Sequence, residues 1–119
     1  MGAAHGQTAQ LVQAACDNFR VYLGEALKIA REGERLTQLQ LAALLGDLLG
    51  SKLDQSYISK VESGDSGISL HRLVALCHIL GWTPAKIVNL AECVSTRGEG
   101  ESDTLVMRRF LRGGQWWQV

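Results

Sequence analysis

The sequence predicts an all-α fold: a compact unit of five helices, an extra helical segment before it and a short tail after it. Apolar residues recur at spacings of three and four along most of the chain, which is the period of an amphipathic helix. Residues that start or stop helices stand at the ends of these stretches. With 46% hydrophobic and 20% charged residues among 119, the composition is that of an ordinary globular domain.

The first helical stretch extends from about Thr8 to Ala30, and Gly33 can stop it. Asp17 and Asn18 can divide this stretch in two, which would leave residues 18–32 as the first helix of the compact unit. The apolar positions that carry the pattern are Leu11, Ala15, Phe19, Leu23, Leu27 and Ala30.

The next two helices have capping residues at their starts. Thr37 can cap helix two, because its hydroxyl can accept from first-turn amides that have no partner within the helix. Asp54 can cap helix three in the same way. The inward faces of the two helices are expected to carry Leu41, Ala42, Ile58 and Val61.

Helices four and five follow directly. Helix four begins at Ser69 and ends at Gly81. Helix five begins at Thr83 and Pro84, because proline at the first helical position loses no hydrogen bond and presets the backbone angle. The inward faces are expected to carry Leu70, Leu73, Val74, Cys77 and Leu80 in helix four and Ile87, Val88, Leu90 and Ala91 in helix five.

The end of the chain is polar and then aromatic. Residues 95–103 have almost nothing to bury and indicate a flexible linker. The expected organisation is an N-terminal helical extension over 1–17, the five-helix unit over 18–94, this linker, and a tail over 104–119. The tail is too short to bury its own aromatic residues. It either packs on a second copy of the chain, together with the N-terminal helix, or folds back on helices one and five through Phe110, Trp116 and Trp117.

Charge and cysteine content exclude several classes of protein. A net charge of zero and a pI of 6.8 argue against binding nucleic acid by overall charge. Cys16, Cys77 and Cys93 are odd in number and far apart, which fits reduced thiols in the cytoplasm and no disulfide framework. They form no metal-ligand pair with His71 or His78. No stretch approaches a membrane span, and no catalytic motif appears, so we expect no enzyme, cofactor or metal.

Residues 36–64 contain two short amphipathic helices joined across a glycine-containing turn, the pattern of a helix-turn-helix. A second helix braced by a first can enter the major groove of DNA, where each base pair shows a distinct set of donors and acceptors. Leu-Thr-Gln-Leu-Gln-Leu-Ala at 36–42 and Tyr-Ile-Ser-Lys-Val-Glu-Ser-Gly at 57–64 carry a resemblance to lambda-type phage repressors and the XRE group of regulators. The resemblance covers roughly residues 19–90.

The resemblance implies a lambda-repressor-like domain in which helix three lies in the major groove, helix two crosses the phosphate backbone, and two copies read two half-sites. It puts Gln38 at the amino end of helix two, where it would bond a phosphate and support helix three. Arg31 and Glu62 occupy the positions of a structural ion pair between helix one and the end of helix three. The residues expected to face bases are Gln55, Ser56, Ser59 and Lys60, with Tyr57 reaching a phosphate or sugar.

Further phosphate contacts are expected beside helix three. Lys52 precedes it, Ser69 offers its hydroxyl and amides at the start of helix four, and Arg72 lies one turn on. Asp65 stands where relatives often carry lysine or arginine, and its negative charge is expected to weaken binding to phosphate. The alternative is that the polar residues of helix three are simply the solvated face of a small amphipathic helix.

The chain departs from the family pattern at the turn, which has about six residues more than the usual spacing. Either the connection is a long loop, or helix two continues for a further turn to Leu49. We favour the second, with Gly46 as the small residue where the two helices cross and Gly50 in the left-handed conformation.

These observations predict a sequence-specific transcriptional regulator, a dimeric repressor on a pseudo-palindromic operator in double-stranded DNA. One alternative is an antitoxin or adaptor that binds a protein partner through the Trp-rich tail. A controller of a restriction-modification operon is a third option within the DNA-binding class.

Overall fold

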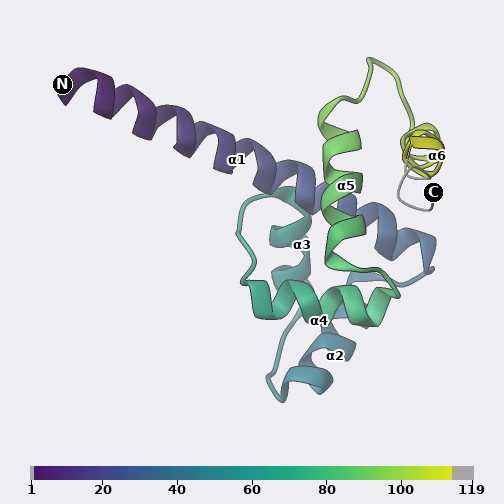
Figure 1. The fold of residues 1–119 in the computed structure, drawn as a ribbon. Helices are drawn as coiled ribbons and strands as arrows, with labels where there is room; N and C mark the ends of the chain where they lie inside the picture. Colours follow the sequence, from purple (N-terminus) through teal and green to yellow (C-terminus); the bar gives the residue numbers. More distant parts are fainter. Residues whose placement is uncertain (1, 114–119) are drawn as a thin grey trace.

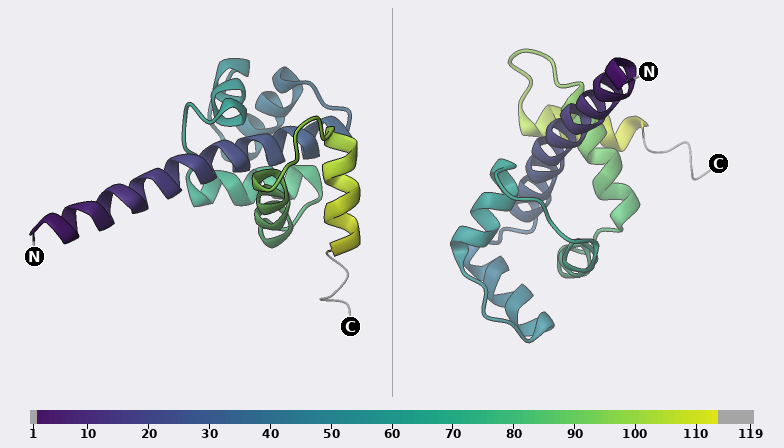
Figure 2. Two further views of the ribbon diagram at one scale, coloured as in Figure 1. Left: turned by 90° about the horizontal axis from the view of Figure 1, so that it is seen from above. Right: turned by 90° about the vertical axis from the view of Figure 1, so that its left-hand side faces the viewer.

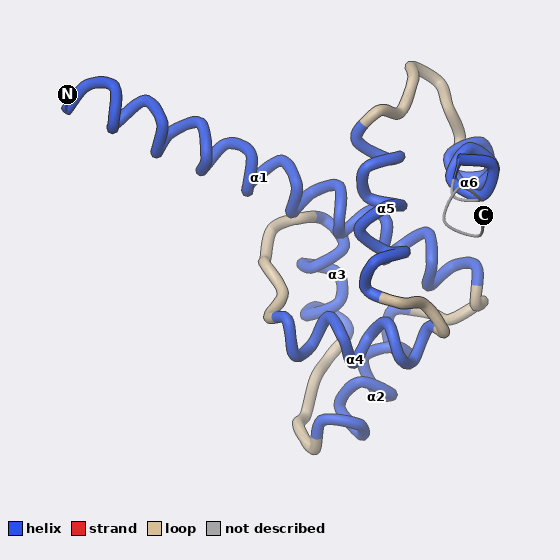
Figure 3. The backbone as a smooth tube through the Cα atoms, in the orientation of Figure 1, coloured by secondary structure: helices blue, strands red, loops and turns tan. Residues whose placement is uncertain are grey.

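The computed structural model describes residues 2–113, with side chains from residue 6 onward, as six helices without strands (Figure 1). The loops are short connections between them (Figure 3). The helices are α1 Gly2–Gly33, α2 Gln38–Leu49, α3 Gln55–Ser63, α4 Leu70–Leu80, α5 Pro84–Ser95 and α6 Asp103–Gly113.

α1 runs through the middle of the fold and extends beyond it. Seen from above, α2 and α3 lie on one side of α1 and α4 and α5 on the other (Figure 2). The C-terminal half of α1 packs against α3 and α5. Its N-terminal half projects away from the other helices.

The expected division of the first helix at Asp17 and Asn18 is wrong, because α1 is continuous through both. Asp17 is held on both sides by partners one turn away: Gln13 Nε2 donates to Asp17 Oδ1 at 3.0 Å, and Arg20 lies 3.4 Å from the same oxygen. Such pairs support a helix rather than break it. The expected boundary between residues 17 and 18 therefore falls inside one element.

The predicted starts of α2 to α5 are confirmed. Thr37, Asp54, Ser69 and Thr83 each occupy the N-cap, and each side chain accepts from a backbone amide of the first turn. At Thr37 the bond is reciprocal, because Gln40 Oε1 accepts from the Thr37 amide at 2.9 Å. These caps fix where each helix begins and so position α2 relative to α3.

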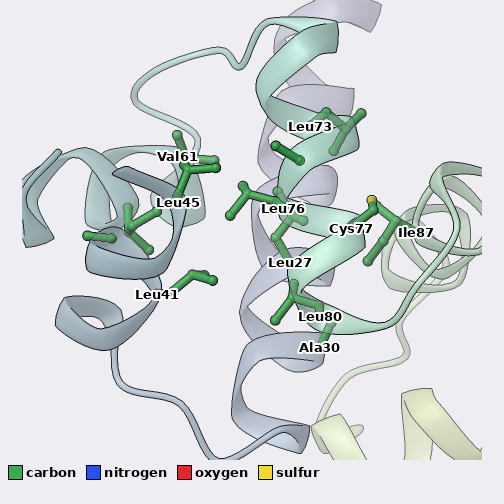
Figure 4. Packing of buried hydrophobic residues seen from close by; sticks show 13 residues of the cluster. Leu27, Ala30, Leu41, Leu45, Val61, Leu73, Leu76, Cys77, Leu80 and Ile87 are labelled. Atoms are coloured by element: carbon green, nitrogen blue, oxygen red, sulfur yellow. The ribbon is translucent and has the colours of Figure 1, made fainter. Parts of the chain in front are cut away.

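The main core lies between α1, α2, α3 and α4, and Ile87 of α5 also belongs to it (Figure 4). Its largest fully buried side chains include the leucines Leu27, Leu41, Leu45, Leu76 and Leu80.

Two residues expected inward on α4 are not buried, since Leu70 is 73% and Val74 47% exposed. The inner face of α4 instead carries Leu73, Leu76, Cys77 and Leu80. On α1, Leu11 is also exposed, because it belongs to the projecting half.

A second core lies between α1, α5 and α6 and contains Ala26, Ile29, Leu90, Val106 and Phe110. The tail is therefore partly folded back on the unit, as one of the two alternatives predicted. Phe110 is 5% exposed, and its ring centroid lies 5.5 Å from that of Trp82. Trp116 and Trp117, predicted to share in this contact or in a dimer, lie outside the described residues.

The expected flexible linker is shorter than predicted and is tied to its neighbours. Residue 95 still belongs to α5, and residue 103 begins α6. Arg109 of α6 donates to the Cys93 carbonyl at 2.7 Å and pairs with Glu101 at 2.7 Å. The bond to Arg109 lowers the pKa of Glu101 below its usual value. These bonds hold the 96–102 connection against α5 and α6.

Within the described residues, no single helix is long and apolar enough to span a membrane. α4 and α5 together reach the length and composition, but they meet at a bend of 94°. The described part of the chain also contains no group of three or more His, Cys, Asp or Glu side chains placed to hold a metal ion. Of the three thiols, Cys77 is buried, and burial raises its pKa.

Candidate functional site

The turn between α2 and α3 is built as the second alternative predicted, with α2 continuing to Leu49. Gly50 follows at φ 66°, in the left-handed region, and caps the helix through its amide to the Gly46 carbonyl. Gly46 was expected where α2 and α3 cross, but it lies buried against the turn instead, where a Cβ would be 2.6 Å from the Ser51 carbonyl oxygen. The long-loop alternative is therefore wrong. The enlarged turn is residues 50–54.

α3 has one buried face and one exposed face. Ile58 and Val61 are 1% and 3% exposed and point into the core, together with Glu62. The predicted base-facing residues Gln55, Ser56, Ser59 and Lys60 are all exposed. The structure thus brings these four side chains to one open face of a short helix, which we call the α3 face.

The predicted ion pair is present below the α3 face. Arg31 donates from Nε to Glu62 Oε2 at 2.6 Å and from Nη2 to Glu62 Oε1 at 3.0 Å. Both residues are buried, and Arg31 Nη1 also donates to the Leu36 carbonyl at 2.7 Å. The bond to Glu62 raises the pKa of Arg31 above its usual value. This pair fixes the end of α3 to α1 and to the start of α2.

Gln38 links this buried pair to the α3 face. Its Nε2 donates to Glu62 Oε1 at 2.9 Å, and its Oε1 accepts from Gln55 Nε2 at 3.3 Å. A chain of hydrogen bonds therefore runs from Arg31 through Glu62 and Gln38 to Gln55. The bond between Gln38 and Glu62 was not predicted from the sequence, because it joins residues 24 positions apart.

Asp54 caps α3 and orients Ser56. Its Oδ1 accepts from the Ser56 hydroxyl at 2.8 Å and from the Tyr57 amide at 3.1 Å. These bonds, chiefly that from Ser56, lower the pKa of Asp54 below its usual value. Since the Ser56 proton is directed to Asp54, the oxygen of this hydroxyl presents lone pairs to the outside.

Tyr57 lies differently from its expected role at a phosphate or sugar. It is half-buried and packs on the main core, and its hydroxyl oxygen is buried without a hydrogen-bond partner. The guanidinium of Arg72 lies over its ring at 4.9 Å from the centroid. Tyr57 therefore supports Arg72 from below in the free chain, through a cation–π contact.

The other predicted phosphate contacts lie near the ends of α3. Lys52 is exposed in the enlarged turn. Ser69 is exposed at the start of α4, and its Oγ accepts from the Arg72 amide at 3.2 Å. Asp65 is also exposed in the loop that follows α3, so an acidic side chain accompanies these groups.

α1 positions α3 through close backbone contact that the sequence analysis missed. At Gly24 an added Cβ would meet the Val61 carbonyl oxygen and would lie 2.6 Å from that of Glu62. Arg20 Nε also donates to the Gly64 carbonyl at 2.8 Å. A glycine inside a strong helical pattern is the signal that could have predicted this crossing, because it costs helix stability unless another backbone approaches it closely.

Comparison with known proteins gives one family match. A family model described as Helix-turn-helix matches residues 27–87, just over half of the 119 residues. The matched region begins in the C-terminal half of α1 and ends in α5, so it includes α2, the enlarged turn and all of α3. No curated protein and no solved structure matches the chain.

Proposed function

The chain belongs to the XRE, lambda-repressor-like family of helix-turn-helix DNA-binding regulators, and from that premise we propose that it is a dimeric repressor whose α3 reads a pseudo-palindromic operator. This is a family of transcriptional regulators rather than of enzymes. The proposed target is double-stranded DNA in the cytoplasm.

The observation that carries the proposal is that α3 has an exposed side, the α3 face, while its opposite side is held in place by buried contacts. Gln55, Ser56, Ser59 and Lys60 are exposed, while the opposite side of the same helix is locked by the Arg31–Glu62 pair. A helix held in this way loses little conformational freedom when it enters the major groove, since its backbone is already placed.

The chemistry of the α3 face suits base recognition. Gln55 uses one Nε2 proton on Gln38, which leaves the second proton and Oε1 for N7 and N6 of adenine. Ser56 offers an acceptor, and Lys60 favours the acceptors O6 and N7 of guanine. The Gln38 bridge thus presets the amide plane that would read the adenine.

Phosphate contacts complete the proposed interface. Gln38 at the start of α2 bonds Gln55, and Arg72 at the start of α4 lies over Tyr57. Lys52 in the turn before α3 and Ser69 before α4 are the other proposed contacts. Helix N-termini attract phosphate because their first amides lack partners within the helix. With zero net charge, the affinity rests on this local arrangement and falls steeply with salt.

The test begins with selection of bound sites from random DNA duplexes by the full chain. On the selected site, Gln55→Ala and Lys60→Ala are each expected to weaken binding by about 1–3 kcal/mol and to relax preference at particular base positions. Gln38→Ala weakens all sequences and also loosens Gln55. Lys86→Ala, an equally basic exposed residue on α5, is the matched control and leaves binding unchanged.

Two results would count against this proposal. One is recovery of no preferred sequence at low salt. The other is an equal effect of Lys60→Ala and Lys86→Ala on every duplex, which would make the α3 face an ordinary solvated surface.

A further inference from the structure

The projecting half of α1 leaves its described side chains in solvent. Every residue from Gly6 to Cys16 is exposed, and Leu11 and Val12 are 71% and 57% exposed. An isolated helix of about 15 residues is marginal in water, because helices draw most of their stability from packing an apolar face. We therefore expect this segment to pack its apolar side chains against another surface.

The apolar side of this segment continues a face that is already buried in the body. Ala26 and Ile29 of α1 are buried in the second core, and Tyr22 packs against it. Counting back from them in alternating steps of four and three gives a stripe that runs off the body onto the projecting half. The stripe is Ile29, Ala26, Tyr22, Phe19, Ala15 and Val12, with Leu11 and Cys16 beside its outer end.

The absence of charged residues in this segment indicates which kind of partner could cover it. Residues 2–16 contain no Asp, Glu, Lys or Arg, although these make up 20% of the chain. The side opposite the stripe carries the neutral Gln7, Gln10 and Gln13. A nucleic acid backbone or a strongly charged partner would be met by complementary charges. A second copy of the same helix needs no complementary charges, since two neutral apolar stripes can pack on each other.

We propose that the projecting half of α1 pairs with the same segment of a second copy, in antiparallel orientation. In this pairing Val12 of each copy lies beside Ala15 of the other, as the positions of an antiparallel coiled coil require. A parallel pairing would bring both bodies to the same end, whereas the antiparallel one separates the two Ala26 positions by about 38 Å along the helix axis. Both α3 faces then remain accessible.

This inference rests on the proposed dimer and names the surface that forms it. The paired length is only about 20 Å, so the interface is smaller than that of a permanent dimer and dimerisation depends on concentration. Binding of both copies to neighbouring half-sites strengthens it by raising the effective concentration.

The test measures the mass of the full chain in solution over a wide range of concentrations. We expect the wild-type mass to rise from 13.0 kDa toward twice that value. Leu11→Glu combined with Val12→Glu should raise the dimer dissociation constant at least about a hundredfold, because buried apolar contacts from both copies are lost. Leu70→Glu is the matched control, since Leu70 is 73% exposed against 71% for Leu11. It should leave the mass curve unchanged.

Other results would overturn the inference. A wild-type mass of 13.0 kDa at every concentration would show that no second copy binds. A dimer that survives the α1 variant but is lost on replacing Trp116 and Trp117 would assign the interface to the tail.

DNA binding separates this inference from the proposed function. The monomeric variant should bind a duplex with one half-site as tightly as the wild type does, and lose only the gain from a second half-site. If the wild type binds no DNA sequence but its dimer is broken by the α1 variant, the inference stands and the repressor proposal falls.

Discussion

Removal of the Glu62 carboxylate tests how α3 is held. Glu62 has a side chain 4% exposed and accepts three bonds, two from Arg31 and one from Gln38. In Glu62→Leu the Arg31 guanidinium, 9% exposed, retains the Leu36 carbonyl at 2.7 Å and Glu32 at 3.7 Å. Loss of one partner of a buried ion pair costs about 3–5 kcal/mol. Out of a total stability of about 5–15 kcal/mol for a domain, this loss is roughly a fifth or more of the whole.

The assay is urea denaturation followed by circular dichroism, with a double-mutant cycle. Arg31→Met combined with Glu62→Leu leaves no buried charge unpaired, so we expect this double variant to be more stable than Glu62→Leu alone. Unchanged m-values would show that the same unfolding is being compared. The reasoning is refuted if Glu62→Leu costs less than about 1 kcal/mol, or if the effects of the two single changes simply add.

Three further predictions concern packing and pH. Gly24→Ala places a Cβ 2.6 Å from the Glu62 carbonyl oxygen, and we expect it to lower the free energy of unfolding by about 1–3 kcal/mol and to weaken DNA binding. Gly33→Ala, with nothing within 4 Å of its Cβ, is the control, and equal effects on stability would contradict the close crossing. Phe110→Ala should lower the free energy of unfolding in urea by about 3–5 kcal/mol, and a loss below about 1 kcal/mol would show that α6 is not packed on α5. Asp54 has a lowered pKa in the folded chain, so its carboxylate stabilises α3 above the pKa of the unfolded chain, near 4, and this contribution is lost as pH falls through the folded value. Stability measured against pH should fall less steeply in Asp54→Asn than in the wild type over this acid range, and parallel curves would exclude Asp54 as the group responsible.

The features predicted well from the sequence are those encoded by neighbouring residues. Thr37, Asp54, Ser69 and Thr83 were recognised as caps because an N-cap acts on amides only two or three residues away. Gly50 indicated the end of α2 for the same reason, since only its own backbone angle is involved. The open side of α3 followed from the period of its apolar residues.

The features missed depend on residues that are distant in sequence. Trp82 and Phe110 are 28 positions apart, so their contact has no local sign in the sequence. The helix over residues 103–113 does have one, because Val106 and Phe110 are one turn apart and Asp103 stands at its start. Tyr57 was expected to reach a phosphate or sugar, but its ring lies under the guanidinium of Arg72, which belongs to another helix. Asp17 has a low helix propensity that was outweighed by its partners one turn away.

Because α1 is continuous past Asp17, the rotation of its outer half about the helix axis is fixed relative to the rest of the fold. Because no hinge separates the outer half from Gly24, the direction in which Val12 points is tied to the position of α3 by the helical repeat. One residue inserted after Asn18 would turn the outer half by about 100° relative to the body, whereas seven would nearly restore it. In the proposed dimer, a change in the length of α1 alone would therefore turn the two α3 faces relative to each other, without altering a residue in either face.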